Sequence, residues 1–240
     1  MKLMIVRHGD PDYEHDSLTP KGWKEAGLLA DRLSKISVRA FYCSPLGRAR
    51  DTASVTLKRM GREATVCNWL QEFPASIIRP DSGKRGIAWD LLPGFWTKRR
   101  ILYDKDGWYH DPVMETGNVQ EFYRAVTDGF DAVLSQYGYE RSGMCYRVSV
   151  ENRDTLVFFC HLGVGCTMIG HLLGIPAPEC QANGQSWCSQ HQDGRKRQAY
   201  HGFQPKPGST CRNVHIHTVT KPHQSHRLPP GKIPAHSRSP

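Results

Sequence analysis

The sequence predicts an α/β fold with three layers, in which helices flank a mostly parallel sheet. Three short, largely apolar runs indicate this fold, because each is too short for a helix and each precedes a segment with helical spacing. These strand-like runs cover residues 3–6, 38–43 and 155–160. A chain of 240 residues is long enough to bury a large core, so we expect one α/β domain with additions.

The first strand leads directly into Arg7-His8-Gly9. Ligands of open α/β sheets bind in the crevice beyond the carboxyl ends of the strands, where these residues fall. Arg7 offers a fork suited to a phosphate, and His8 can act as a nucleophile or a proton carrier. Gly9 lets the backbone turn and approach a ligand closely. Taken alone, such a tripeptide is more often an ordinary turn after a strand.

The helix that follows has a clear start. Thr19 can cap it, Pro20 is its first residue, and Leu18 and Trp23 stand at the positions of a hydrophobic staple. The side chains expected to face inward are those of Trp23, Ala26, Ala30 and Leu33. The carboxylates just upstream are expected to form a solvated loop face: Asp12, Glu14 and Asp16.

The second strand, at 38–43, is also followed by a helix start. Ser44 reads as an N-cap and Pro45 as the first helical residue. One helical face is formed by the apolar side chains of Leu46, Ala49, Ala53, Leu57 and Met60. Arg48 therefore lies in the first turn, where free N–H groups and the helix dipole attract anions. The alternative is a solvated surface arginine.

The third strand ends at a second histidine, His161. Apolar residues then recur at helical spacing, at Val164, Met168 and Leu172, and Gly174 is suited to end that helix. A lone histidine at such a place is ordinarily a satisfied core or cap residue. The three segments together, however, put two histidines and two arginines at the carboxyl ends of three expected parallel strands.

With these motifs combined, the chain resembles the histidine phosphatase superfamily, the phosphoglycerate-mutase-like proteins. The motifs are Arg-His-Gly at 7–9, Ser-Pro-x-x-Arg-Ala-x-x-Thr-Ala at 44–53, and His161 after an apolar strand. Residues 18–22 are similar to the family's Leu-Thr-x-x-Gly. The resemblance covers about residues 1–175, and the combination is specific although each piece alone is not.

The resemblance implies phosphoryl transfer through a phosphohistidine. We expect His8 to attack phosphorus in line through a ring nitrogen. Arg7 and Arg48 would neutralise the equatorial oxygens and His161 would add a donor, each preorganised donor typically being worth about 3–4 kcal/mol of the barrier. Because the arginines take the place of a metal ion, neither a metal nor another cofactor is expected.

A leaving alkoxide also needs a proton. Glu72 matches the glutamate of the family's Leu-x-Glu, so the resemblance makes it the candidate general acid and, later, the base for the attacking water. The sequence departs from the common pattern directly after it, at residues 73–76, where many relatives continue with Gly and Trp. Asp111 or Glu115 is an alternative acid, and Glu72 would then be a surface glutamate.

The residues after Gly9 favour a phosphatase over a mutase. Mutases of the family usually continue with a Ser and then Trp-Asn, which suit a phosphoryl group and a substrate carboxylate. This chain has Asp10-Pro11-Asp12-Tyr13 instead, and acidic residues do not suit a small trianionic glycerate phosphate. We therefore expect a phosphomonoester hydrolase, with phosphoglycerate-mutase-type transfer as the alternative.

The domain organisation follows from the same patterns. Residues 1–175 are expected to form the catalytic domain, with an inserted specificity region at about 74–150. Aromatic residues are dense in that insert, and they can form either the core of an inserted subdomain or a helical cover over the pocket. A good amphipathic stripe predicts a helix at about 117–137.

The last segment, 176–240, reads as an irregular or disordered basic tail. It holds nine Lys and Arg against two Asp and Glu, and it is rich in Pro and His. Only 213–220 has the pattern of a strand. The abrupt loss of hydrophobic patterning near 177–180 suggests a shifted reading frame, so a truncated, non-catalytic family member is the second alternative.

The remaining features limit the compartment and the partners. No apolar run is long enough to span a membrane, and eight irregularly spaced cysteines suggest reduced thiols in a cytoplasm. The expected partner is a phosphorylated small molecule. Nucleic acid is a weak expectation, since aromatic residues are few in the basic tail, and the tail's Cys and His fit no regular zinc spacing. The sequence leaves the oligomeric state open.

Overall fold

The sheet at the centre of the protein is parallel throughout. A computed structural model describes residues 1–88, 91–176 and 215–219. Its five-stranded sheet has the order β11-β1-β10-β4-β5. The strands are β1 (Lys2–Arg7), β4 (Ala40–Cys43), β5 (Thr65–Val66), β10 (Thr155–Cys160) and β11 (His215–Val219). Every neighbouring pair in this sheet is parallel.

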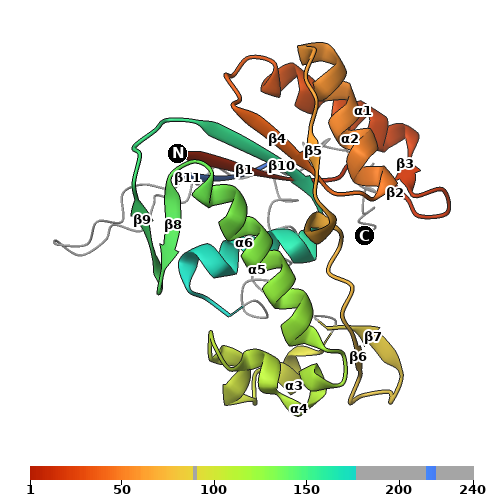
Figure 1. Cartoon of the computed structure of the whole chain (residues 1–240). Coiled ribbons are helices and arrows are strands. Elements are labelled where there is room, and N and C mark those ends of the chain that lie inside the picture. Colours follow the sequence, from red (N-terminus) through yellow and green to blue (C-terminus); the bar gives the residue numbers. More distant parts are fainter. Residues whose placement is uncertain (89–90, 177–214, 220–240) are drawn as a thin grey trace, which may run out of the picture.

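Helices cover both faces of the sheet, which confirms the three-layer α/β fold (Figure 1). On one face lie α1 (Pro20–Leu33) and α2 (Gly47–Met60), and on the other lie α5 (Val119–Ser135) and α6 (Leu162–Leu173). Helix α5 falls within the range 117–137 that its amphipathic stripe predicts.

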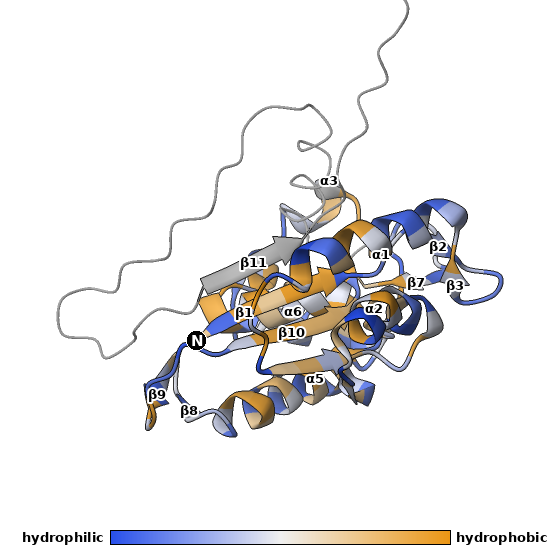
Figure 2. Cartoon of the chain, turned by 90° about the horizontal axis from the view of Figure 1, so that it is seen from above, coloured by the Kyte–Doolittle hydropathy of each residue, from blue (hydrophilic) through white to orange (hydrophobic). Residues whose placement is uncertain are grey.

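Strand β10 shows why the two layers form. All six of its residues are buried. Val157 and Phe159 pack with α1 and α2, whereas Leu156 and Phe158 pack with α5 and α6. Successive side chains of a strand point to opposite faces, so a continuous apolar run supplies both cores. Figure 2 shows the resulting apolar sheet between helices whose outer faces are polar.

Helix α1 begins where the sequence predicts but buries a different stripe. Thr19 Oγ1 accepts a hydrogen bond from the Gly22 N–H at 3.1 Å, and Pro20 is the first helical residue. The inward position expected for Trp23 is wrong, since this side chain is 42% exposed. The buried residues of the helix are Gly22, Ala26, Leu29, Ala30 and Leu33. A Cβ at Gly22 would lie 2.3 Å from the carbonyl oxygen of Asp10, so the helix packs through its glycine and turns Trp23 outward.

Three short hairpins and a group of short helices complete the described part of the chain. The hairpins and helices are β2 (Pro11–Asp12), β3 (Ser17–Leu18), η1 (Asn68–Leu70), β6 (Ser76–Ile78), β7 (Arg85–Ile87), α3 (Pro93–Trp96), η2 (Arg100–Tyr103), η3 (Trp108–His110), α4 (Pro112–Glu115), β8 (Tyr139–Ser142) and β9 (Cys145–Val148). Trp108 is buried and meets the rings of Tyr109 and Tyr123 edge to face. At least part of the aromatic cluster of the insert is therefore core.

The strand expected at 213–220 is present as β11, which pairs with β1 from Lys2 to Val6. The rest of the segment that the sequence marks as a basic tail, 177–214 and 220–240, lies outside the described residues. The expectations placed there, including the loose Cys and His set, stay expectations.

Candidate active site

Three strand ends bring the predicted site residues to one edge of the sheet. The N–H of His8 donates to the carbonyl of Cys160 at 3.0 Å, and the N–H of Ser44 donates to the carbonyl of Phe159 at 2.9 Å. These backbone bonds continue the pairing of β1 and β4 with β10. The residues that follow all three strands therefore meet at the same edge, as parallel pairing requires.

The two histidines that follow β1 and β10 lie side by side. The ring centroids of His8 and His161 are 5.1 Å apart, and their planes are inclined by 56°. His8 Nδ1 is 2.7 Å from the carbonyl oxygen of Gly9. Because a carbonyl oxygen only accepts, this contact puts the proton of the neutral ring on Nδ1 and leaves the lone pair on Nε2.

Packing against α1 requires a residue without a side chain at position 9, whether or not a ligand also approaches it. A Cβ at this position would lie 2.9 Å from the carbonyl oxygen of Gly22, in α1. The N–H of Gly9 donates to Oγ1 of Thr52, whose hydroxyl in turn donates to the carbonyl of Arg48. Gly9 and Thr52 thus join the turn after β1 to the first turns of α2.

His161 is buried and uncharged. Its Nε2 is 2.8 Å from Ser44 Oγ, which also accepts the N–H of Leu46. Burial lowers the pKa of His161 to about 3, and the nearby charge of Arg48 and the ring of His8 act in the same direction. The other ring nitrogen, Nδ1, is buried and has no hydrogen-bond partner within the described chain.

The two arginines present further unused donors. The Nε atoms of Arg7 and Arg48 are buried and, like His161 Nδ1, find no partner among the described residues. Only Thr56 Oγ1 and Trp108 Nε1 share this property in that part of the chain. Buried donors are nearly always satisfied, so three unsatisfied nitrogens in one cluster indicate a place for a hydrogen-bond acceptor. Since a guanidinium is always charged, that acceptor should be an anion.

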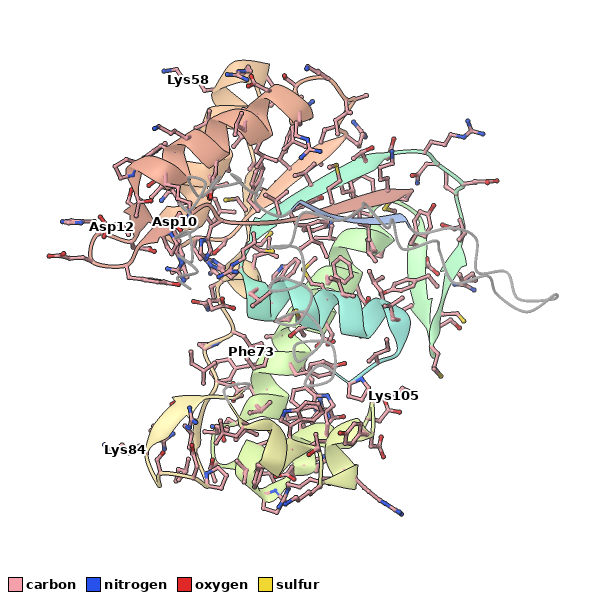
Figure 3. The ribbon with its side chains drawn as sticks, turned by 180° about the vertical axis from the view of Figure 1, so that it is seen from behind. Asp10, Asp12, Lys58, Phe73, Lys84 and Lys105 are labelled. Carbon is pink, nitrogen blue, oxygen red and sulfur yellow. The ribbon has the colours of Figure 1, made fainter. Side chains whose placement is uncertain are left out.

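Glu72 reaches the first turn of α6, two residues after His161. Its Oε1 accepts the N–H of Gly163 at 3.0 Å and the N–H of Phe73 at 3.1 Å. Burial raises the pKa of Glu72, although these N–H groups and Arg7 oppose the rise. Figure 3 shows Phe73 on the connection between the sheet and the insert, and Asp10 and Asp12 on the loop beside α1.

The alternative acids are engaged elsewhere, within the insert. Asp111 is fully buried, caps α4 through the N–H of Val113 and pairs with Arg99. Glu115 lies 3.5 Å from Nδ1 of His110. The structure therefore puts Glu72 against the turn that follows His161, whereas Asp111 is engaged in capping α4 and pairing with Arg99.

Two predictions about the loops around α2 are wrong. The helix begins at Gly47, not Pro45, and Ser44 contacts His161 instead of capping it. Asp16 is not merely part of a solvated face, because it pairs with Arg48. Sequence patterns could not find this contact, since it joins residues 32 positions apart through loop geometry.

Other kinds of site are not formed by the described residues. No group of three His, Cys, Asp or Glu side chains in residues 1–88 and 91–176 is arranged to hold a metal ion. No helix in the same part of the chain has the length and apolar character to cross a bilayer.

The fold and the site define an α/β protein in which two histidines and the unpaired, buried donors of two arginines form a cluster suited to an anion. Residues 3–78 match the histidine phosphatase superfamily (branch 1). The match covers about a third of the chain, and over this segment it confirms the resemblance carried by the sequence motifs.

Known proteins with similar sequence or fold are phosphatases and a mutase. The 2,3-bisphosphoglycerate-dependent phosphoglycerate mutase of Thermoplasma acidophilum is 31% identical over 84 residues, which are 30% of this chain. The match spans only 42% of the mutase. A phosphoserine phosphatase of Entamoeba histolytica, solved with 3-phosphoglyceric acid, has a similar fold, with 21% identity, a TM-score of 0.50, and coverage of 76% of this chain and 85% of that one. The α-ribazole phosphatase of Shigella flexneri gives 22% identity, a TM-score of 0.45, and coverage of 75% and 83%.

Proposed function

We propose that this protein is a metal-independent phosphomonoester hydrolase that works through a phosphohistidine on His8. Nε2 of His8 attacks phosphorus in line, the bond between phosphorus and the ester oxygen breaks, and the leaving alkoxide takes a proton from Glu72. Glu72 then removes a proton from water, which attacks the phosphohistidine and releases inorganic phosphate. The substrate is a phosphorylated small molecule.

One observation carries this proposal: the unsatisfied donors of Arg7, Arg48 and His161 next to the ring of His8. A phosphoryl group supplies several acceptor oxygens and two negative charges, so it matches such a cluster in both respects. The hydrogen bond to Gly9 supports the attacking role, because it holds the lone pair of His8 on Nε2. When the proton of the neutral His161 ring is on Nδ1, this nitrogen is a further donor to the phosphoryl group. Because the ring is uncharged, it does not repel the arginines.

The environment of Glu72 supports its role as the acid. Burial raises its pKa, which favours the protonated form that a general acid needs. The N–H groups of Phe73 and Gly163 both donate to Oε1, which holds the carboxyl group in place for proton transfer.

A mutase is the second candidate, favoured by the match to the Thermoplasma enzyme. The loop after Gly9 argues for the hydrolase. Asp10 is only partly exposed, and Asp12 and Glu14 follow it closely. Carboxylates at this edge would repel the carboxylate of a phosphoglycerate, whereas water carries no charge.

The test is to trap the intermediate with a radiolabelled phosphomonoester and a denaturing quench at alkaline pH, where phosphohistidine survives. We expect label on the wild type and on His15→Ala, which changes an exposed histidine of the neighbouring loop, and none on His8→Ala. Label that leaves as inorganic phosphate supports the hydrolase, and label that moves to glycerate supports the mutase. Wild type without label would instead support a non-catalytic protein.

A further inference from the structure

Asp16 holds Arg48 from a loop that the catalytic scheme does not use. Its Oδ1 accepts a hydrogen bond from Arg48 Nη1 at 2.6 Å, and its Oδ2 accepts the N–H of Gly47 at 2.6 Å. One carboxylate therefore bridges the guanidinium and the first turn of α2. Both contacts are charge-assisted, which makes them stronger than neutral hydrogen bonds.

The backbone on both sides of this contact is fitted to it. Asp16 has a φ of 45°, in the left-handed region that costs a residue with a side chain some free energy. A Cβ at Gly47 would lie 2.0 Å from the carbonyl oxygen of Asp16, so the loop can approach α2 only at a glycine. Such a costly conformation persists when the surrounding structure uses it.

Two further contacts fasten the same loop. Ser17 Oγ donates to Asp51 Oδ2 at 2.6 Å, which ties the loop to the second turn of α2. The guanidinium carbon of Arg48 lies 5.6 Å from the centre of the Tyr13 ring, within the range of a cation–π contact. The guanidinium of Arg48 is thus hydrogen-bonded to Asp16 through Nη1 and lies over the ring of Tyr13.

We propose that Asp16 is a positioning residue, which turns the buried Nε edge of Arg48 toward the phosphoryl group. The inference rests on the proposed function, because the role of Arg48 does. Asp16 accepts a hydrogen bond from Nη1 of Arg48. Nε of Arg48 makes no bond to Asp16 and is one of the buried, unsatisfied donors of the site. Asp16 also fills the anion position at the start of α2, so the phosphate is directed to the side chains of the cluster.

The charge state of Asp16 suits this task. Burial acts to raise its pKa, but the hydrogen bonds from Gly47 and Arg48 outweigh that effect and keep the pKa below its usual value. The carboxylate is therefore charged at any pH where the enzyme would work. Because the side chain is 41% exposed, its ion pair should contribute little to stability, and its removal should leave the fold intact.

The first experiment compares Asp16→Ala, Asp16→Asn and Ser17→Ala with wild type, using hydrolysis of p-nitrophenyl phosphate. We expect Asp16→Ala to lower kcat/KM about a hundredfold, since misplacing a group by about 1 Å can have that effect. Asp16→Asn keeps an acceptor oxygen and should recover about tenfold of the loss. Ser17→Ala removes a bond between the same loop and helix and should stay near wild type. Equal values for Asp16→Ala and Ser17→Ala would overturn the proposal.

The second experiment repeats Asp16→Ala in an Arg48→Ala background. If Asp16 acts through Arg48, its removal has no further effect once the guanidinium is gone. A further loss as large as in the wild-type background means that Asp16 acts independently, and the proposal is then wrong.

A binding measurement separates this inference from the proposed function. If the wild type hydrolyses no phosphomonoester, the proposed function fails, but calorimetric titration with inorganic phosphate still reports on Arg48. Binding about tenfold weaker in Asp16→Ala than in Ser17→Ala supports the positioning role. Equal binding in the two variants, or no binding by wild type, overturns it.

Discussion

Two histidines on the same helix, His161 (buried) and His171 (partly exposed), belong to clusters that differ in their hydrogen bonding. His161, at the start of α6, belongs to the candidate site with Arg7, Arg48 and His8. His171, near the end of the same helix, belongs to a second cluster with Asp131, Tyr146 and Arg141, which we call the α5–α6 network. Both clusters lie partly on α6, and both contain charged groups.

The α5–α6 network is satisfied internally. His171 Nε2 lies 3.0 Å from both carboxylate oxygens of Asp131, which also accepts the hydroxyl of Tyr146. Arg141 donates to the carbonyls of His171 and Gly143 and covers the Tyr146 ring at 4.9 Å. The site cluster, in contrast, leaves three buried nitrogens without partners in the described chain.

If the proposed function holds, this difference separates a structural cluster from a functional one. Burial of a polar group costs free energy unless the group is hydrogen-bonded, so a satisfied network contributes to the fold. An unsatisfied cluster is tolerated when a ligand completes it. Substitutions in the two clusters should therefore separate activity from stability.

The largest expected effect is on catalysis by Arg48→Ala. Loss of a preorganised donor to the transferring phosphoryl group should lower kcat/KM about a thousandfold. The melting temperature should change little, because Nε has no partner in the described chain and the ion pair of Arg48 with Asp16 is partly exposed to solvent. Arg141→Ala in the α5–α6 network is the matched control and should keep its activity. Comparable losses of activity in the two variants would contradict the distinction.

Glu72→Gln should have the next largest effect, and that effect should depend on the leaving group. With an alkyl phosphate, loss of the general acid should lower kcat/KM, which reports the steps up to formation of the phosphohistidine, about a hundredfold. With p-nitrophenyl phosphate the leaving group needs no proton, so the loss of kcat/KM should be much smaller. Steady-state values of kcat/KM for both substrates check this, and equal losses would remove Glu72 from the acid role.

Acid should destabilise the protein through His161. Its pKa is about 3 in the folded chain and about 6.5 when unfolded, so between these values only the unfolded state binds the proton. The free energy of unfolding should therefore fall as pH falls, by up to about 1.4 kcal/mol per pH unit. Urea titrations of wild type and His161→Asn at pH 6 and 5 measure this, and the variant should show the smaller change. Identical changes would mean that His161 is not buried in its neutral form.

The smallest effect is expected in the α5–α6 network. Asp131→Asn weakens the contacts to His171 and Tyr146 and should lower the free energy of unfolding by about 1 kcal/mol. Activity should stay within a factor of about two, because the network lies outside the site. Denaturant titration and kcat/KM together check this prediction. A large loss of activity with unchanged stability would instead join the network to the site.

Much of the fold could be predicted because its signals are local. The apolar runs that become β1, β4 and β10, and the cap formed by Thr19, depend on neighbouring residues. The prediction for Trp23 is wrong because helical spacing shows which side chains share a face of the helix but not which face packs against the sheet. Contact between Gly22 and Asp10 decides that direction, and this contact appears only in the folded chain.

The sequence by itself determined which chemistry is available: the motifs name His8, Arg7, Arg48, His161 and Glu72, and the strand-end rule puts the histidines and arginines at one edge. Only the tertiary structure decided how those groups are used. It turned Ser44 toward His161, held Glu72 at the start of α6, and brought Asp16 onto Arg48. The physical reason is that residue type and local pattern set what a group can do. Its protonation, its partners and its orientation depend on burial and on atoms contributed by distant parts of the chain.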